Sequence, residues 1–494
     1  MFGFVGNIYV QAKIQSLNKI RESAVELQEL ELDKIIYHNR KVSYLKQFAA
    51  ISTNYASFVS HIPVVTYEDL KPYIEKMMRG EENILCADSI TNFAKSSGTT
   101  DVSKYIPVSK SSMFKGHFQG SRHLLASYFE RFPNNKIFKG KNLVVSGSLQ
   151  TVPNNPSAFV GDVSAILTNQ IPQWIQRLRT PDLATALLSN WDEKLNAIAR
   201  QTAFENVTGL SGVPSWSLEL LKAVLQISGK KNIEQVWHNF ELYIHGGVNF
   251  SPYQTQFENI VGKRVNYINA YNASEGFFAF SDTENTDELL LLPQHDIFYE
   301  FRELEHPQQI VPLEGVIKNI LYEIILTTNS GLWRYALGDT VEFTSINPYR
   351  FKIVGRTKQY INIAGEELMV HNAEEAIAAA SKTTGMHVQE FSAAPLFLED
   401  GKICHQWFIE FENTPKSTVQ FQHILDEKLQ QLNSDYKAKR SGNYILQPLQ
   451  IVAVPQNLFR NWLGAKEKLG GQHKVPRLSN NRIFAEEFLA LITT

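Results

Sequence analysis

Ser96-Ser97-Gly98-Thr99-Thr100 is the first of three short segments whose order along the chain says most about its fold. This segment offers four hydroxyl groups and a flexible glycine within five residues. Polyphosphates need such donors, and a glycine lets backbone N–H groups approach a phosphate closely. Lys104 adds a positive charge nearby, but the Gly-x4-Gly-Lys frame of a P-loop is absent. The segment indicates a phosphate-binding loop, with a polar turn between apolar stretches as an equally good interpretation.

The second segment is Tyr271-Asn272-Ala273-Ser274-Glu275-Gly276, which follows a strand-like run that is expected to end at Ala270. Ligand-binding loops often stand at strand ends. The Tyr271 ring is suited to stack on a base. Glu275 is the one strong anion of the segment, and a Mg²⁺ ion that accompanies ATP is often held by one carboxylate plus phosphate oxygens. Taken alone, a structural turn with a solvated Glu275 is the better interpretation.

The third segment, Trp333-Arg334-Tyr335-Ala336-Leu337-Gly338-Asp339, places Asp339 at an expected turn after an apolar run. A carboxylate there can accept hydrogen bonds from both ribose hydroxyls, and Arg334 either pairs with it or lines the site. The alternative is a strand-end aspartate beside a salt-bridged arginine. Each segment alone is weak, but their order and spacing together indicate a site that holds ATP and activates a carboxylate.

Length and composition narrow the class of protein. A chain of 494 residues is too long for one ordinary core, so two domains are expected. A net charge of -2 argues against a nucleic-acid binder, which usually has a basic excess. Cys86 and Cys404 are expected to be reduced thiols. No uncharged apolar run reaches the roughly 18 residues of a spanning helix. We therefore expect a cytoplasmic protein that binds no membrane. We also expect it to be a monomer.

The hydrophobic pattern predicts how the chain is divided. Helices are expected over residues 12–49, 67–79, 110–135 and 181–202, and strands over 142–146, 237–250, 264–270, 298–301 and 321–326. Gly355, surrounded by charged residues, marks a hinge at about 354–362, so the predicted domains are 1–354 and 355–494. In the second domain Asn372 is expected to cap a helix that runs through Ala380.

Taken together, the three segments closely resemble the nucleotide motifs of the Gretchen Hagen-type acyl acid–amido synthetases, the auxin-responsive family within the acyl-adenylate-forming superfamily. Gly355-Arg356 resembles the family's inter-domain hinge, and Gly470-Gly-Gln-His-Lys-Val-Pro-Arg477 resembles its C-terminal Gln-x-Lys-x-Pro-Arg element. The resemblance covers about residues 20 to 482. The compact length favours a bacterial member.

This resemblance implies an α/β fold: a large N-terminal adenylate-forming domain of mixed sheets with a β-barrel and flanking helices, and a small mobile C-terminal α/β domain. It implies ATP and Mg²⁺ as cofactors, and a small-molecule carboxylic acid and an amino acid as partners. The nucleotide would be held by Ser96, Ser97, Gly98, Thr99, Thr100, Tyr271, Asn272, Ala273, Ser274, Asp339 and Arg356. Glu275 would hold Mg²⁺, and Lys474 would reach the α-phosphate. Arg122 would contact the acid, or else lie on a solvated helix face.

The implied activity is that of a ligase that forms carbon–nitrogen bonds and releases AMP. The chain departs from the plant motifs at Trp333, at Gly276-Phe277 and at His473, positions that concern the acyl and amine pockets. One alternative is an acyl-CoA ligase that uses the same adenylate, although the C-terminal lysine does not lie in the Gly-Lys-x-x-Arg arrangement common in that class. The other is a non-catalytic acyl or nucleotide sensor, against which the presence of Glu275, Asp339 and Lys474 argues.

Overall fold

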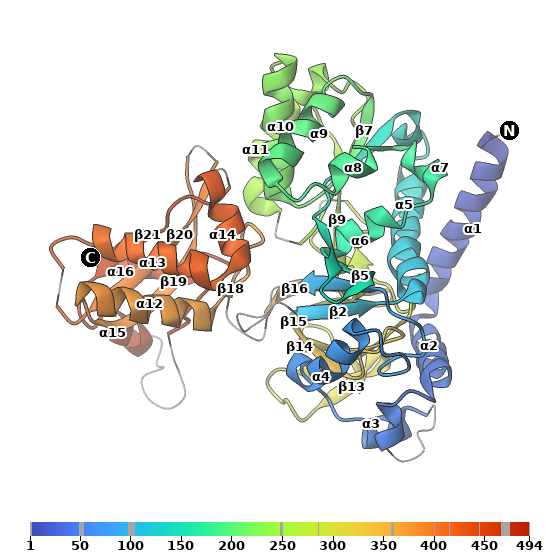
Figure 1. Ribbon diagram of the computed structural model, residues 1–494, viewed down its shortest axis with the longest axis horizontal. Helices are drawn as coiled ribbons and strands as arrows, with labels where there is room; N and C mark the ends of the chain where they lie inside the picture. The colour runs from blue at the N-terminus through green and yellow to red at the C-terminus, as the bar shows by residue number, and fades with distance from the viewer. Residues whose placement is uncertain are drawn as a thin grey trace. The chain divides into compact units, whose positions relative to one another are not determined.

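The chain forms two compact units (Figure 1). The computed structural model describes residues 2–48, 54–96, 104–247, 250–284, 286–356, 360–399, 401–413, 415–443, 445–465 and 475–493. Unit 1 comprises Met1–Ser96, Lys104–Gly247 and Phe257–Thr357, and unit 2 comprises mainly Lys358–Thr494. Within these described ranges, no helix is both long enough and apolar enough to cross a membrane.

Unit 1 is built on a mixed sheet of 12 described strands in the order β13-β12-β14-β15-β16-β11-β10-β9-β8-β7-β3-β6. Neighbours from β13 to β9 are antiparallel, whereas those from β9 to β6 are parallel. The strands are β3 (Lys141–Val144), β6 (Arg179–Thr180), β7 (Val207–Ser211), β8 (Leu242–His245), β9 (Asn266–Ala273), β10 (Gly276–Phe280), β11 (Leu289–Leu291), β12 (Ile297–Glu303), β13 (Ile310–Pro312), β14 (Leu321–Thr328), β15 (Tyr335–Ile346) and β16 (Tyr349–Arg356).

A smaller sheet of four described strands has the order β2-β1-β5-β4. Its strands are β1 (Asn92–Ser96), β2 (Lys104–Val108), β4 (Leu149–Val152) and β5 (Asn155–Gly161). Among the described strands, the pairings of both sheets form open series, so the expected β-barrel is not a closed ring of paired strands. The large sheet stays open because β9 pairs in parallel with β8, which extends the sheet instead of closing its antiparallel half.

The helices of unit 1 pack on these sheets and on one another. They are α1 (Phe2–Glu22), α2 (Ala24–Asn39), α3 (Tyr55–His61), α4 (Tyr67–Met78), α5 (Phe118–Arg131), α6 (Val163–Asn169), α7 (Gln173–Gln176), α8 (Leu183–Ala186), α9 (Trp191–Thr202), α10 (Pro214–Ser228) and, from Phe257 on, α11 (Ser251–Val261). Leu17 of α1 and Leu124 of α5 belong to one core cluster with Phe277 of β10. Gly120 of α5 allows this packing, because an added Cβ would lie 2.6 Å from the Phe277 ring.

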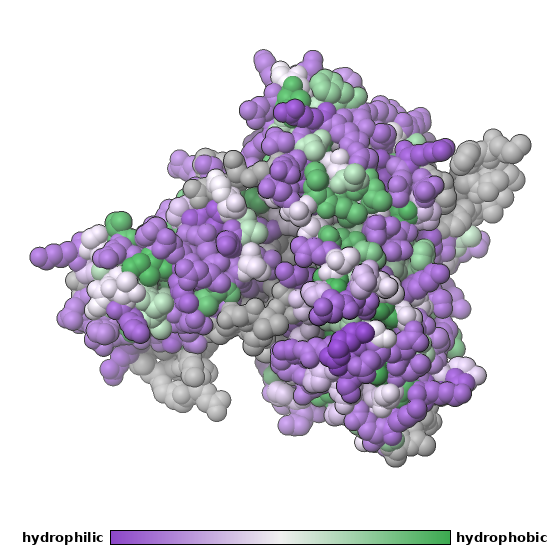
Figure 2. All heavy atoms as spheres, viewed as in Figure 1, coloured by the Kyte–Doolittle hydropathy of each residue, from purple (hydrophilic) through white to green (hydrophobic). Residues whose placement is uncertain are grey.

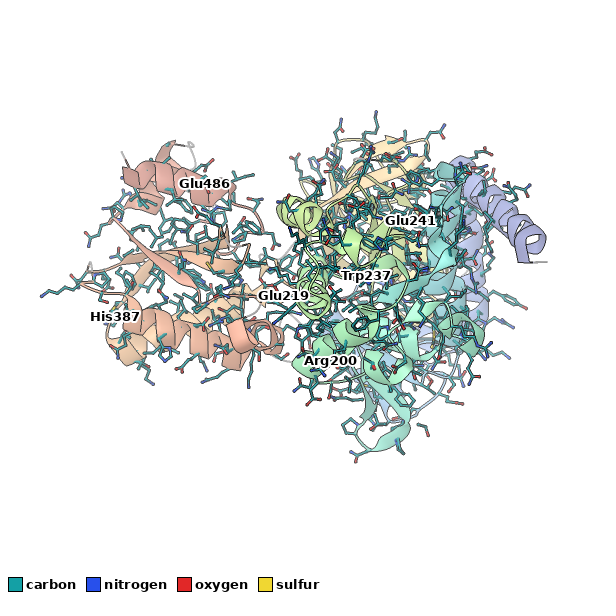
Figure 3. All side chains as sticks on the ribbon, turned by 90° about the horizontal axis from the view of Figure 1, so that it is seen from above. Arg200, Glu219, Trp237, Glu241, His387 and Glu486 are labelled. Carbon is teal, nitrogen blue, oxygen red and sulfur yellow. The ribbon has the colours of Figure 1, made fainter. Side chains whose placement is uncertain are left out.

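Trp237 shows how a loop is fixed inside unit 1 (Figure 3). Its side chain is fully buried, and the indole N–H donates to the Thr202 carbonyl at 2.8 Å, which ties the end of α9 to the segment before β8. The sequence predicted a strand over 237–250, but the strand in the structure is Leu242–His245. The aromatic residues before it are buried for packing and not for strand pairing.

Unit 2 is an α/β unit with a three-stranded described sheet in the order β19-β20-β21. Its elements are β17 (Tyr360–Ile361), β18 (Leu368–Met369), α12 (Val370–Thr384), β19 (Val388–Phe397), β20 (Ile403–Phe411), α13 (Val419–Leu432), α14 (Ser434–Arg440), β21 (Gln450–Val454), α15 (Leu458–Ala465) and α16 (Ile483–Thr493). The predicted cap at Asn372 is wrong, because α12 already begins at Val370 and Asn372 is buried within it.

Candidate active site

The predicted phosphate segment begins with the last residue of β1, one strand of the β1–β2 pair. β1 and β2 pair in antiparallel register from Asn92 opposite Val108 to Ser96 opposite Lys104. Ser96 is the last residue of β1, and Ser97, Gly98, Thr99 and Thr100 lie outside the described residues. Lys104 is the first residue of β2. The hairpin thus brings Ser96 and Lys104, one at each end of the predicted loop, next to each other.

The second segment forms a β-hairpin. β9 continues through Tyr271, Asn272 and Ala273, beyond the strand end expected at Ala270, and β10 begins at Gly276. Ser274 and Glu275 form the two-residue turn between them, and both are half-buried. The strand extends because Tyr271 and Asn272 pair with Ala279 and Phe277 of β10. β9 is also the strand at which the sheet changes from parallel to antiparallel pairing.

Asp339 lies within β15, and not at the turn that the sequence predicted. Thr340 of β15 pairs with Glu323 of β14, whereas Ala336 pairs with Ile325, so β15 carries two extra residues and bulges between them. Gly338 has φ +91°, a backbone conformation that glycine adopts easily. Bulges re-aim side chains and occur often beside active sites. The bulge therefore sets the direction of the buried Asp339 carboxylate.

The three segments meet through side-chain contacts. The Tyr271 hydroxyl donates a hydrogen bond to Asp339 Oδ2, which joins the second segment to the third. Lys104 Nζ donates to the Tyr335 hydroxyl at 3.2 Å, which joins the base of the phosphate hairpin to the third segment. Arg356 of β16 pairs with Asp339 in the strand register. The structure thus brings the second and third segments into contact, and it places Lys104, the strand partner of Ser96, against the third.

Asn272 makes a contact that the sequence analysis did not anticipate. His117 Nδ1 lies 2.7 Å from Asn272 Oδ1, at the end of a π-helical stretch, Ser112–His117, that leads from the phosphate hairpin into α5. Burial lowers the pKa of His117 to about 4, although the hydrogen bond to Asn272 opposes this shift. The imidazole is therefore neutral at physiological pH, and its Nδ1–H donates to Asn272. π-Helical stretches are rare and often stand at functional sites.

His295 and Asp296 are a second feature that the sequence analysis missed. Both have positive φ, 81° and 64°, which is costly for residues other than glycine. His295 Nε2 lies 3.0 Å from His123 Nδ1 on α5, and the Ser111 hydroxyl donates to Asp296 Oδ2. Burial lowers the pKa of His295 and raises that of Asp296. Nothing in the local sequence signals this backbone, because packing against α5 and the π-helical stretch imposes it.

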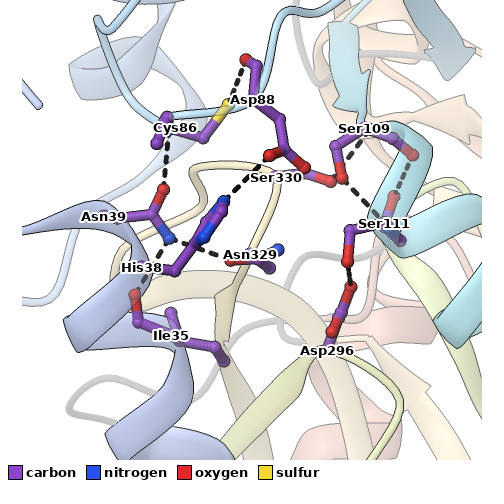
Figure 4. Close-up of polar contacts among 12 residues, drawn as sticks. Ile35, His38, Asn39, Cys86, Asp88, Ser109, Ser111, Asp296, Asn329 and Ser330 are labelled. Atoms are coloured by element: carbon purple, nitrogen blue, oxygen red, sulfur yellow. Dashed lines mark hydrogen bonds and ion pairs between the residues drawn. The ribbon is translucent and has the colours of Figure 1, made fainter.

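A polar network fixes the turn that leads into the third segment (Figure 4). Asn39 of α2 donates to Asn329 Oδ1 at 3.0 Å and accepts from the Ala87 N–H at 2.8 Å. The Ser109 N–H donates to the Ser330 hydroxyl at 3.1 Å. Gly331 has φ +102°, a backbone conformation that glycine adopts easily, at the turn that follows β14. The network therefore holds the turn against α2 and against the segment that follows the phosphate hairpin.

Arg334 takes the structural role that the sequence analysis gave as an alternative. Its Nε and Nη2 each donate to Glu300 of β12 at 2.8 Å, and Nη1 donates to the Ile62 carbonyl at 2.7 Å. Both side chains are buried, so this is a bidentate ion pair within the core of unit 1. Arg334 therefore anchors the start of the strand that carries Asp339, and it pairs with Glu300 and not with Asp339.

Arg122 lies on the exposed face of α5, where Nη1 is 3.4 Å from Gln119 Oε1. Its positive charge helps to lower the pKa of Lys13 on α1, after the larger effect of burial. This exposed position is compatible with both interpretations from the sequence, a solvated helix face and acid binding. The acid-contacting role of Arg122 stays a prediction.

Lys474 and His473 lie outside the described residues, but the segment that follows them is anchored in unit 2. The Ala393 N–H of β19 donates to the Arg477 carbonyl at 2.9 Å, and the Ser479 N–H donates back to the Ala393 carbonyl at 2.9 Å. The Arg477 guanidinium stacks on the Phe391 ring, with 4.5 Å from Cζ to the ring centroid, and pairs with Glu390. Residues 475–479 are therefore fixed along β19.

The family relationship agrees with this arrangement. The chain matches the GH3 family N-terminal domain over residues 13–265, the GH3 family central domain over 289–356 and the GH3 family C-terminal domain over 371–483. The first match alone covers just over half of the chain. The chain belongs to the GH3 family. The Gretchen Hagen-type family that the sequence analysis identified is thereby confirmed.

Similar proteins cover this GH3 protein almost end to end. The 4-substituted benzoates-glutamate ligase GH3.12 of Arabidopsis thaliana is 22% identical, and the match covers 94% of each chain. The structure of AtGH3.15 acyl acid amido synthetase in complex with 2,4-DB has a TM-score of 0.63 at 19% identity, and the match covers 98% of this chain and 96% of that one. The structure of 2-hydroxyisobutyryl-CoA ligase has a TM-score of 0.58 at 13% identity and coverage of 95% and 92%. The predicted fold class, an α/β fold with a large N-terminal and a small C-terminal part, is confirmed.

Proposed function

We propose that this GH3 protein is an ATP-dependent acyl acid–amido synthetase. It activates a carboxylic acid as an acyl-adenylate and transfers the acyl group to the amine of an amino acid. The observation that carries the proposal is the junction of the three segments, in which Tyr271 contacts Asp339 and Lys104 contacts Tyr335. Membership of a family whose relatives include a benzoate–glutamate ligase supports the same reaction class.

The donor set of unit 1 fits a nucleotide. Asp339 is a buried carboxylate, and its Oδ2 accepts a hydrogen bond from the Tyr271 hydroxyl. This hydrogen bond fixes the orientation of the carboxylate, which can then accept hydrogen bonds from ribose hydroxyls. The Tyr271 ring is held edge-on by Phe278, with 4.8 Å between ring centroids. This fixed ring offers a surface against which an adenine can pack. Ser96, Ser97, Gly98, Thr99 and Thr100 would hold the phosphates at the hairpin tip, and Asn272, Ala273, Ser274 and Arg356 would complete the nucleotide site.

Glu275 fits Mg²⁺, because it is a hard oxygen donor at the turn beside the strand of Tyr271. Among the described residues, no group of three or more His, Cys, Asp or Glu side chains is arranged to hold a metal ion. When bound, Mg²⁺ supplies charge neutralisation on the phosphates. Glu275, at the β9–β10 turn, would hold the ion in position.

The first step joins two anions. A carboxylate oxygen attacks the α-phosphorus of ATP, the bond to the β-phosphate oxygen breaks, and pyrophosphate leaves. Lys474 offsets the negative charge that develops at the α-phosphate. In the second step the neutral amine attacks the acyl carbonyl, AMP leaves with the former carboxylate oxygen, and the amine proton passes to solvent or to a base. Arg122 is the cation we propose for steering the acid.

The acyl-CoA ligase remains the second candidate, because the fold of 2-hydroxyisobutyryl-CoA ligase is similar. The C-terminal element favours the amido synthetase, since Lys474 stands in Gln-x-Lys-x-Pro-Arg. Cys86 and Cys404 are both free thiols, which fits the proposed cytoplasmic location. A monomer and a bacterial origin belong to the same proposal.

The test of this function is product analysis. The protein is incubated with Mg-ATP, a pool of aryl and alkyl carboxylic acids and a pool of amino acids, with benzoate and glutamate included, and products are identified by mass spectrometry. We expect AMP and a new amide, both dependent on the acid and the amine. An acyl-CoA product in a parallel reaction with coenzyme A, with no amide formed, would select the second candidate instead.

Tyr271→Phe tests the nucleotide site. The hydroxyl fixes the Asp339 carboxylate, and a hydrogen bond to a charged group contributes about 1.5 kcal/mol or more, so the KM for ATP should rise roughly tenfold. The acid-dependent exchange of pyrophosphate into ATP measures this KM. Tyr267→Phe, on the same strand but packed against Tyr243, is the matched control and should leave the KM unchanged. Equal KM values for Tyr271→Phe and wild type would show that the contact plays no part in ATP binding.

A further inference from the structure

A pocket of about 660 Å³ opens at the edge of the large sheet of unit 1. It is lined by Gln173, Gln176, Arg177, Arg179, Pro181, Asp182 and Leu183, which come from α7, β6, α8 and the segments between them. β6 is the last strand of the sheet, and β3, β7 and β8 separate it from the Tyr271 strand β9. Four strand spacings correspond to about 20 Å. This Arg179 pocket is therefore a place distinct from the nucleotide site.

The guanidinium of Arg179 is buried without a counter-charge. The residue is 7% exposed, its Nε has no hydrogen-bond partner, and Nη2 donates to the Thr168 hydroxyl at 3.3 Å. Within the described part of the chain, no carboxylate forms an ion pair with it, and burial lowers the pKa of Arg179 to about 10. An uncompensated buried charge is costly, so proteins keep one mainly where something binds to it.

Three other buried or half-buried arginines of this protein show what the Nε and Nη2 groups of such a side chain usually bind. Each uses its Nε and Nη2 together on one carboxylate; these pairs are Arg334 with Glu300, Arg350 with Asp282 and Arg440 with Asp426. A planar fork of two N–H groups matches a carboxylate in geometry and charge. Arg179 lines the pocket, and its same two nitrogens have only the long contact from Nη2 to the Thr168 hydroxyl and no carboxylate.

The remaining walls of the pocket do not neutralise Arg179. The Asp182 carboxylate is committed to α8, because it accepts from the Thr185 N–H at 3.0 Å and from the Thr185 hydroxyl at 3.1 Å. Pro181 and Leu183 supply apolar surface, and Figure 2 shows hydrophobic atoms gathered on the face that carries α6 and α8. The pocket is much larger than an inorganic anion. A carboxylate on an apolar body fits this combination.

We propose that the Arg179 pocket is a second organic-acid site, in which Arg179 binds the carboxylate and Pro181 and Leu183 contact the apolar body of the acid. An inorganic phosphate shares the oxyanion chemistry that a guanidinium recognises. The apolar walls favour the organic acid. The site lies apart from the adenylation chemistry, so it goes beyond the proposed function and does not depend on it.

The test is a calorimetric titration of the full chain with benzoate. The adenylation site is first filled with a non-hydrolysable benzoyl-adenylate analogue in which a sulfamate replaces the phosphate, so that further benzoate binding reports a second site. We expect one residual site in wild type and at least about tenfold weaker binding in Arg179→Gln, because a charge-assisted pair of hydrogen bonds is lost. A parallel titration with inorganic phosphate should give weaker binding than benzoate.

A second variant keeps the proposal testable even if Arg179→Gln does not fold. Leu183→Trp fills the pocket and leaves the guanidinium in place, so it should also abolish residual benzoate binding. Leu178→Trp is the matched control, because Leu178 is exposed and does not line the pocket. The proposal would be overturned if wild type bound no further benzoate, or if wild type and Leu183→Trp bound it equally well. Tighter binding of phosphate than of benzoate would overturn the assignment to an organic acid. If the analogue does not bind, benzoate is not an acid of the adenylation site, and the titrations of wild type and Leu183→Trp without the analogue report on the pocket alone.

Discussion

Lys474→Ala is expected to lower the rate of acyl-adenylate formation roughly a hundred- to thousandfold, because one well-placed charge at a developing anion typically contributes about 3 to 4 kcal/mol to catalysis. The affinity for ATP should change little, since the nucleotide contacts that we propose are made by Tyr271, Asp339 and the phosphate hairpin. Acid-dependent exchange of labelled pyrophosphate into ATP measures the rate, and equilibrium binding of ATP measures the affinity.

Lys468→Ala is the matched control for this variant. Lys468 lies six residues earlier in the same glycine-containing stretch, carries the same charge, and has no proposed role. It should exchange pyrophosphate at the wild-type rate. If Lys474→Ala exchanges as fast as wild type, the α-phosphate role of Lys474 is rejected.

Glu300→Gln is expected to destabilise unit 1 by about 3 to 5 kcal/mol, because breaking a buried ion pair leaves its partner charge uncompensated. Glu300 and Arg334 are 1% and 7% exposed as side chains, and two hydrogen bonds of 2.8 Å join them. Arg334 also has φ 45°, a conformation that only surrounding contacts can hold in a residue other than glycine. Loss of the pair should loosen the strand that carries Asp339.

Urea denaturation measures this effect, with hydrogen exchange of β12 and β14 amides assigning the transition to unit 1. Glu284→Gln is the matched control, since Glu284 pairs with Arg264 on the surface at 3.3 Å. Exposed pairs contribute about 0 to 1 kcal/mol, so the control should stay near wild type. A Glu300→Gln protein within 1 kcal/mol of the control would contradict the structural role of the pair.

From the sequence, the family and the contact between distant segments were predicted correctly, whereas parts of the local backbone structure were not. Three segments far apart in the chain indicated one site, and Tyr271 and Asp339 are indeed in contact. The strand end at Ala270 and the turn at Asp339 were wrong, because cross-strand pairing extends β9 and a bulge lets β15 continue through Asp339. The secondary-structure propensity of one segment carries no information about the strand with which that segment pairs.

The unanticipated residues depend on long-range packing. His117 has no motif around it, and its place becomes visible only when the π-helical stretch meets Asn272 of β9. The same is true of His295 and Asp296, whose positive φ values follow from contacts with α5 and Ser111. The roles of Ser97, Gly98, Thr99, Thr100 and Lys474 stay predictions, because these residues lie outside the described ranges.

Transfer of a labelled carboxylate oxygen tests the central claim most directly. The protein is incubated with Mg-ATP, an amino acid that it accepts, and benzoate or another accepted acid that carries ¹⁸O at both carboxylate oxygens. The masses of the products are then measured by mass spectrometry. If the carboxylate attacks the α-phosphorus and the amine then displaces AMP, each AMP carries one ¹⁸O and the amide keeps the other. Unlabelled AMP, or ADP with the label in inorganic phosphate, would contradict activation through an acyl-adenylate.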